Sequence, residues 1–95
     1  MIDESNTQMF AIASLAMDLK RVAVFYNRGS RRHAERFSEE ALARREEIDE
    51  NKLKPYLKKF YNKLPEILDQ KDEKKIAEDT LMYSTIFQNY ALHNF

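Results

Sequence analysis

The apolar residues between positions 5 and 27 lie on nearly every side of a predicted helix rather than along one stripe. They are Met9, Phe10, Ile12, Leu15, Met17, Leu19, Val22, Val24, Phe25 and Tyr26. A helix that is apolar on most sides needs packing partners on most sides. We therefore predict that this helix forms the centre of a compact bundle or the interface of an oligomer.

Local signals predict where this first helix begins and ends. Ser5 and Gln8 have the spacing of a capping box, in which each side chain bonds a free backbone amide at the helix start. Gly29 is the only glycine, and glycine readily adopts the left-handed conformation that ends a helix. Ser30 then occupies an N-cap position. The chain should turn tightly here, so that the first two helices form an antiparallel hairpin.

The second predicted helix, at about residues 31–51, has a thin apolar stripe and many charged residues. Its stripe consists of Ala34, Phe37, Ala41 and Ile48, with Leu42 beside it. Charges of opposite sign recur four residues apart, as between Arg36 and Glu40, and such pairs stabilise a solvent-exposed helix face. We expect this helix on the outside of the domain.

Two further helices complete the predicted fold. The third starts near Leu53, and its apolar stripe continues past Pro65, which predicts a kink rather than an end. The fourth starts after Asp72, its best N-cap, and reaches the C-terminus. We predict one all-α domain over residues 1–95, a small antiparallel bundle of four helices. The alternative has three helices, with the second and third merged into one kinked helix.

Composition restricts the function classes. One glycine and two prolines argue against a β-rich fold or a glycine-rich phosphate loop. The formal net charge is zero, so no global attraction to nucleic acid or anionic lipid is expected. The apolar run at residues 9–17 is about half the length that spans a bilayer, and we expect no membrane partner. The lack of cysteine fits a reducing compartment, and we expect a cytoplasmic location.

The sequence contains no strong catalytic or metal-binding signature. The two histidines are far apart in sequence, so no metal site and no cofactor are expected. Arg28 and His33, however, have R-x4-H spacing, which resembles the motif of HEPN-type RNases, a family of small helical dimers. The resemblance implies that paired Arg and His side chains cleave RNA, with His as acid or base and Arg on the phosphate. We assign no catalytic residue and keep this activity as the alternative.

Basic residues gather around the turn between the first two helices. Arg28, Arg31, Arg32, His33 and Arg36 make up this group, which is the candidate site for an anion or nucleic acid. In an antiparallel bundle they would lie at the same end as Asp69, Asp72 and Glu73. Arg28, Arg31 and Arg32 could then face these acids. The favoured interpretation is that such blocks of charge set topology and solubility, and nucleic acid is the less favoured partner.

The first and fourth helices carry more apolar surface than one small bundle is expected to bury. The candidate interface consists of Met9, Phe10, Ala13, Met17, Val24, Met82 and Ile86. Such an excess is typical of a protein-binding face. We therefore predict a non-enzymatic interaction or regulatory module that forms a homo-oligomer or binds another helical protein.

Overall fold

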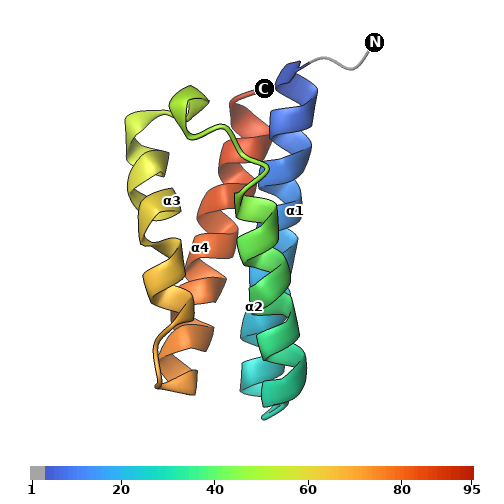
Figure 1. Ribbon diagram of the computed structural model, residues 1–95, viewed down its shortest axis with the longest axis vertical. Coiled ribbons are helices and arrows are strands. Elements are labelled where there is room, and N and C mark those ends of the chain that lie inside the picture. Colours follow the sequence, from blue (N-terminus) through green and yellow to red (C-terminus); the bar gives the residue numbers. More distant parts are fainter. Residues whose placement is uncertain (1–3) are drawn as a thin grey trace.

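The computed structural model describes residues 4–95 of the chain, and side chains from residue 6 onward. Four α-helices follow one another up and down (Figure 1), and the described residues form no strand. They are α1 (Glu4–Asn27), α2 (Arg31–Arg45), α3 (Pro55–Leu68) and α4 (Glu73–His93), with the short 3-10 helix η1 (Glu50–Lys52) between α2 and α3. The predicted four-helix bundle is confirmed. The merged alternative is wrong, because residues 46–54 separate α2 from α3.

The turn between α1 and α2 has the predicted form. Gly29 has a φ of +74°. The amide of Ser30 donates to the carbonyl of Phe25 at 2.8 Å, and that of Gly29 to the carbonyl of Tyr26 at 3.1 Å. This pair of bonds satisfies carbonyls that the helix end leaves free, as in a Schellman motif. Ser30 holds the N-cap position of α2, but its hydroxyl makes no capping bond and lies 2.7 Å from Nδ1 of His33 instead.

The end of α2 differs from the prediction. The helix ends at Arg45 rather than near residue 51. The segment that follows turns inward and buries Ile48 and Leu53, each 5% exposed. The side chain of Gln8 holds it, because Nε2 donates to the carbonyl of Asp49 at 2.9 Å and Oε1 accepts from its amide at 3.0 Å. Burial of two apolar side chains over the end of the bundle therefore overrides the helix propensity of this segment.

The predicted capping box between Ser5 and Gln8 is wrong. Gln8 bonds the backbone of Asp49 on the opposite segment, and Ser5 lies inside α1 rather than before it. The side chain of Ser5 lies outside the described residues.

The later helix boundaries follow the predicted signals closely. Pro55 is the first residue of α3, where its missing amide costs no hydrogen bond. The helix continues through Pro65 to Leu68, so this proline does not end it. Asp72 caps α4, because its carboxylate accepts bonds from the amides of Lys74 and Lys75 at 3.1 and 3.2 Å.

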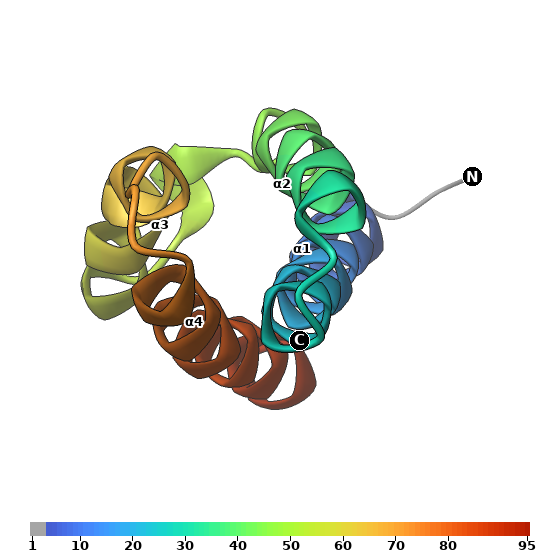
Figure 2. The same cartoon turned by 90° about the horizontal axis from the view of Figure 1, so that it is seen from below.

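The core is centred on α1 and α4, which form the most extensive contact between helices. Ile12, Leu15, Leu19 and Val22 of α1 are fully buried, as is Phe87 of α4. The hydroxyl of Ser84 donates to the carbonyl of Ala16 at 2.8 Å across this contact. Figure 2 shows the order α2, α1, α4, α3 around the bundle, with α2 and α3 joined by η1 and its flanking residues. The contact between α2 and α3 is the smallest of those between successive helices.

Candidate interaction surface

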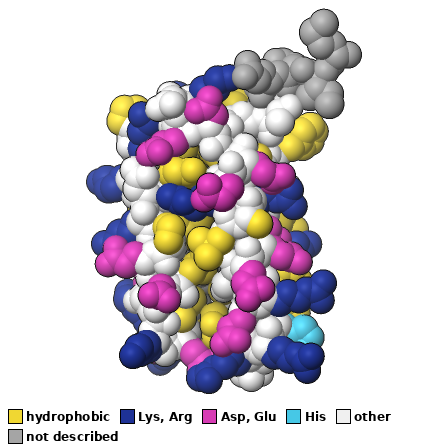
Figure 3. Space-filling view, viewed as in Figure 1, with side chains coloured by type: hydrophobic (Ala, Val, Ile, Leu, Met, Phe, Trp, Pro, Cys, Tyr) yellow, Lys and Arg dark blue, Asp and Glu magenta, His cyan; other side chains and the backbone are white. Residues whose placement is uncertain are grey.

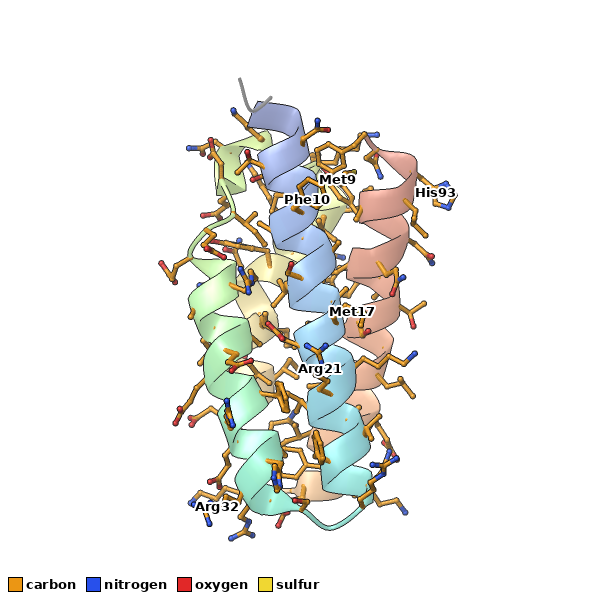
Figure 4. All side chains as sticks on the ribbon, turned by 90° about the vertical axis from the view of Figure 1, so that its right-hand side faces the viewer. Met9, Phe10, Met17, Arg21, Arg32 and His93 are labelled. Atoms are coloured by element: carbon orange, nitrogen blue, oxygen red, sulfur yellow. The ribbon has the colours of Figure 1, made fainter. Side chains whose placement is uncertain are left out.

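One side of α1 faces solvent and carries apolar residues at seven-residue steps. Phe10 is 64% exposed and Met17 is 44% exposed, while Val24 is half-buried. Residues seven apart are nearly aligned on a helix, so these three form one line, the α1 outer row. Figure 4 shows Phe10 and Met17 on the outer side of α1, between α2 and α4. Exposed apolar residues in a line along a helix are typical of a helix–helix contact surface.

A shallow apolar hollow of about 380 Å³, the Phe37 hollow, lies at the Val24 end of this row. It is lined by Met17, Lys20, Arg21, Val24, Phe25 and Phe37. The rings of Phe25 and Phe37 stack with centroids 5.6 Å apart, and the guanidinium of Arg21 lies over Phe37 at 5.4 Å. These stacked groups give the hollow a fixed wall.

The Phe10 end of the row has a different border. Phe10 lies beside Arg44 and Glu47 of the α2 end, and all three line one hollow of about 350 Å³. The Arg44 guanidinium donates to the Glu47 carboxylate at 2.9 Å. Because these two charges pair with each other, the surroundings of Phe10 carry little net charge.

His33 belongs to the aromatic stack and not to a pair with Arg28. Its ring stacks on Phe25 at 5.1 Å, and its Nδ1 lies against the Ser30 hydroxyl. In the described part of the chain, no hydrogen bond or ion pair joins Arg28 to His33. Gly29 breaks the helix between them, so the two residues do not share a helix face.

Only some of the arginines near the α1–α2 turn form ion pairs with acidic residues that the structure describes. Arg31 forms an ion pair with Glu73 at the start of α4, as the charge pattern predicted. Arg36 pairs with Glu40 one turn along α2 at 3.7 Å. Arg28 and Arg32 are exposed, and Arg32 lies at the tip of α2 (Figure 4). The group therefore spreads over the end of the bundle and does not converge on one point.

The other predicted interface residues do not form one patch with the outer row. Met9 and Ala13 are half-buried and pack against the core. Met82 is 50% exposed but lies with Lys63 and Ile67 around a hollow between α3 and α4. Ile86 is half-buried and packs against the core. Met82 thus lies on a different face of the bundle from the α1 outer row.

Asp18 is a buried acid that the sequence reasoning missed. It is 4% exposed, and Oδ1 accepts a bond from Arg21 Nη1 at 3.2 Å, while Oδ2 is buried without a hydrogen-bond partner among the described residues. Burial raises the pKa of the Asp18 carboxyl above its ordinary value, and the nearby Glu40 raises it further. The signal in the sequence was an isolated acid between Met17 and Leu19 in an apolar run.

The structure offers no assembled metal site in its described residues. No group of three or more His, Cys, Asp and Glu side chains there could hold a metal ion. Among the same residues, no helix combines the length and the apolar character that crossing a bilayer requires.

Comparison of the chain with protein families, with curated proteins and with solved structures finds no match. The surface chemistry of the bundle is therefore the basis for assigning a function.

Proposed function

We propose that this chain is a small non-enzymatic helical interaction module that pairs with a second copy of itself through the α1 outer row. One observation carries the proposal. The exposed side chain of Phe10 and the half-buried side chain of Val24 lie seven residues to either side of Met17 on the same face of α1, and Met17 and Val24 both line the apolar Phe37 hollow.

This spacing is self-complementary. When two copies of α1 pack antiparallel about a two-fold axis at Met17, Phe10 of each copy lies opposite Val24 of the other. Seven residues of helix are about 10 Å long, so Phe10 and Val24 are equally far from the axis. Each Phe10 ring then enters the Phe37 hollow of the other copy, and the two Met17 side chains meet at the centre. A two-fold interface uses each such contact twice.

The expected pairing is apolar and depends little on salt. The aliphatic stems of Lys20 and Arg21 line the hollow, which lets their charges remain in water. Arg44 and Glu47 neutralise each other beside Phe10. Burial of aromatic and methionine side chains supplies the free energy of association. Met82 and Ile86 lie outside this contact.

Sedimentation across a range from nanomolar to high micromolar concentration tests the proposal. We expect a monomer–dimer equilibrium in the micromolar range that changes little with salt. Phe10→Asp should weaken it about 30-fold or more, the effect of losing an aromatic anchor that fills a hollow of the other copy. Met17→Asp should act in the same direction. Met82→Asp is the matched control for Met17→Asp, because Met82 is 50% exposed against 44% for Met17 but lies beside the α3–α4 hollow, and it should leave the dimer intact.

Two results would contradict the proposal. A wild-type chain that stays monomeric at every concentration would remove the second copy as partner and leave a different helical protein as the occupant of this face. Equal weakening by Met82→Asp would place the contact on α4 instead.

No observation favours the RNA alternative, since Arg28 and His33 do not meet, and we do not propose it. For the cellular location we propose the cytoplasm, on the lack of cysteine alone.

A further inference from the structure

A groove of about 520 Å³ lies between α2 and α3, on a face that the α1 outer row does not reach. It is lined by Ser38, Glu39, Leu42, Pro65, Glu66, Leu68 and Asp69. Figure 3 shows hydrophobic side chains along the middle of this face, with Asp and Glu side chains on both sides of them. The groove exists because α2 and α3 hardly touch each other.

The floor and the rim of this α2–α3 groove differ in chemistry. Leu42, Pro65 and Leu68 are half-buried, so each still presents apolar surface to a ligand. Glu39 on one side and Glu66 with Asp69 on the other are exposed acids. No Lys, Arg or His is among the described residues that line the groove. An apolar floor with an acidic rim fits a ligand that is apolar on one side and basic beside it.

A bridge beyond one end of the groove ties α2 to α3. The Arg45 guanidinium lies 4.1 Å from the ring centroid of Tyr61, and its Nε donates to the Tyr61 carbonyl at 2.9 Å. The hydroxyl of Tyr61 donates to the carbonyl of Arg45 at 3.3 Å. These contacts fix the separation of the two helices, so the groove is formed before any ligand arrives. Preorganisation of this kind reduces the cost of binding.

We propose that the α2–α3 groove binds a basic amphipathic helix of a partner protein. Apolar side chains of that helix pack on Leu42 and Leu68, and its Lys or Arg side chains pair with Glu39 and Glu66. A helix in a groove between two helices is a recurrent mode of recognition. The acidic rim repels the phosphates of nucleic acids and of anionic lipids, which leaves a basic peptide as the fitting ligand. Because only α2 and α3 line it, the groove stays open in the proposed α1 dimer.

The full chain and two synthetic helical peptides test this proposal. The first peptide carries Leu on one face and Lys on the other, and the second carries Glu in place of Lys. In a two-dimensional amide NMR titration, we expect the Leu/Lys peptide to shift the signals of Ser38, Leu42 and Leu68 most, with binding that weakens as salt rises. The Leu/Glu peptide should not bind.

Charge reversal separates the groove from general attraction between charges. Glu39→Lys and Glu66→Lys should each weaken binding of the Leu/Lys peptide about fivefold or more, as expected for loss and reversal of one charge pair. Glu78→Lys is the control, since Glu78 is exposed on α4, outside the groove, and the substitution changes the net charge equally. It should change the affinity less than about twofold.

Three outcomes would overturn the proposal. Equal weakening by Glu78→Lys would show attraction without a site. Peptide-induced shifts centred on Phe10 and Met17 would place the peptide on α1. Weaker self-association of Glu39→Lys in sedimentation would show that a second copy occupies the groove, whereas failure of the α1 dimer alone would leave the groove proposal standing.

Discussion

The fully buried side chains of α2, which packs on α1, are alanines, whereas those of α3, which packs on α4, are large. The buried residues of α2 are Ala34 and Ala41. Those of α3 are Leu57, Tyr61, Leu64 and Ile67. Small side chains let two helix backbones come close, and the α1–α2 contact is accordingly more extensive than the α3–α4 contact. Large side chains hold α3 at a greater distance from α4, where rings such as Phe60 and Tyr83 meet edge to face at 5.2 Å.

The two outer helices also meet different buried acids. Asp18, beside α2, has one oxygen without a hydrogen-bond partner among the residues that the structure describes, and its pKa is raised mainly by burial. Asp79, beside α3, accepts bonds from Gln70 Nε2 at 3.0 Å and Lys75 Nζ at 3.1 Å. Burial alone would raise the pKa of Asp79, but these two bonds bring it below its ordinary value.

The different packing of α2 and α3 explains why the bundle is open between these two helices. Each outer helix is held by its own neighbour in the α1–α4 pair, by close backbone packing for α2 and by large side chains for α3. Apart from the bridge between Arg45 and Tyr61, little draws α2 and α3 together. The groove between them therefore results from two independent contacts, α2 on α1 and α3 on α4. Each contact can be tested by changing the size or the charge of one residue.

The largest effect on stability is expected from truncating a large buried side chain of α3. Leu64→Ala removes a fully buried side chain and should lower the free energy of unfolding by about 2–5 kcal/mol. That is a large part of the roughly 5–10 kcal/mol expected for a domain of this size. Urea denaturation measures it. Leu42→Ala, on the half-buried groove wall, is the control and should cost about 1 kcal/mol or less. Equal losses would mean that the groove is closed in solution.

A smaller effect on stability is expected from enlarging a small buried side chain of α2. Ala41→Leu adds volume at a fully buried position between close helices and should cost about 1–3 kcal/mol through overpacking. Ala43→Leu makes the same change on the exposed side of α2 and should stay within about 0.5 kcal/mol of wild type. If Ala41→Leu left the free energy of unfolding unchanged, the α1–α2 contact would be looser than the structure shows.

The smallest effects concern the two acids, which should respond to pH in opposite directions. Asp79→Asn should lower stability at neutral pH by about 1 kcal/mol, since it weakens the charge-assisted bonds from Gln70 and Lys75. The lowered pKa of Asp79 means that its contribution is present above the ordinary value of 3.8 and is lost as the pH falls through the pKa of the folded state.

Asp18→Asn should instead raise stability at neutral pH by about 1 kcal/mol, because it removes a charge that burial penalises. The raised pKa of Asp18 means that this gain shrinks as the pH falls from the folded-state pKa through 3.8, below which the acid is protonated in both states. Thermal unfolding between pH 3 and pH 7 measures both variants. Parallel pH profiles for the two would refute the contrast between the acids.

Several features of the structure could be predicted from local sequence signals. The helix-ending Gly29, the capping Asp72 and the stripe through Pro65 each act within a few residues, and the structure agrees with all three. The ion pair between Arg31 and Glu73 followed from charge signs and an antiparallel order of helices. Of the predicted interface residues, Phe10, Met17 and Met82 are exposed, and their role in binding stays a prediction.

Other features depend on contacts between distant parts of the chain. The sequence alone determined a helical bundle, the turn at Gly29, the cap at Asp72 and an excess of apolar surface on α1, because helix periodicity and capping are properties of neighbouring residues. Only the tertiary structure decided that Gln8 binds Asp49, that Asp18 is buried beside α2 and that Met82 lies on the α3 side. It also decided that α2 and α3 stand apart. Packing distance depends on the side chains of both helices at a contact, and the sequence of one helix cannot specify it.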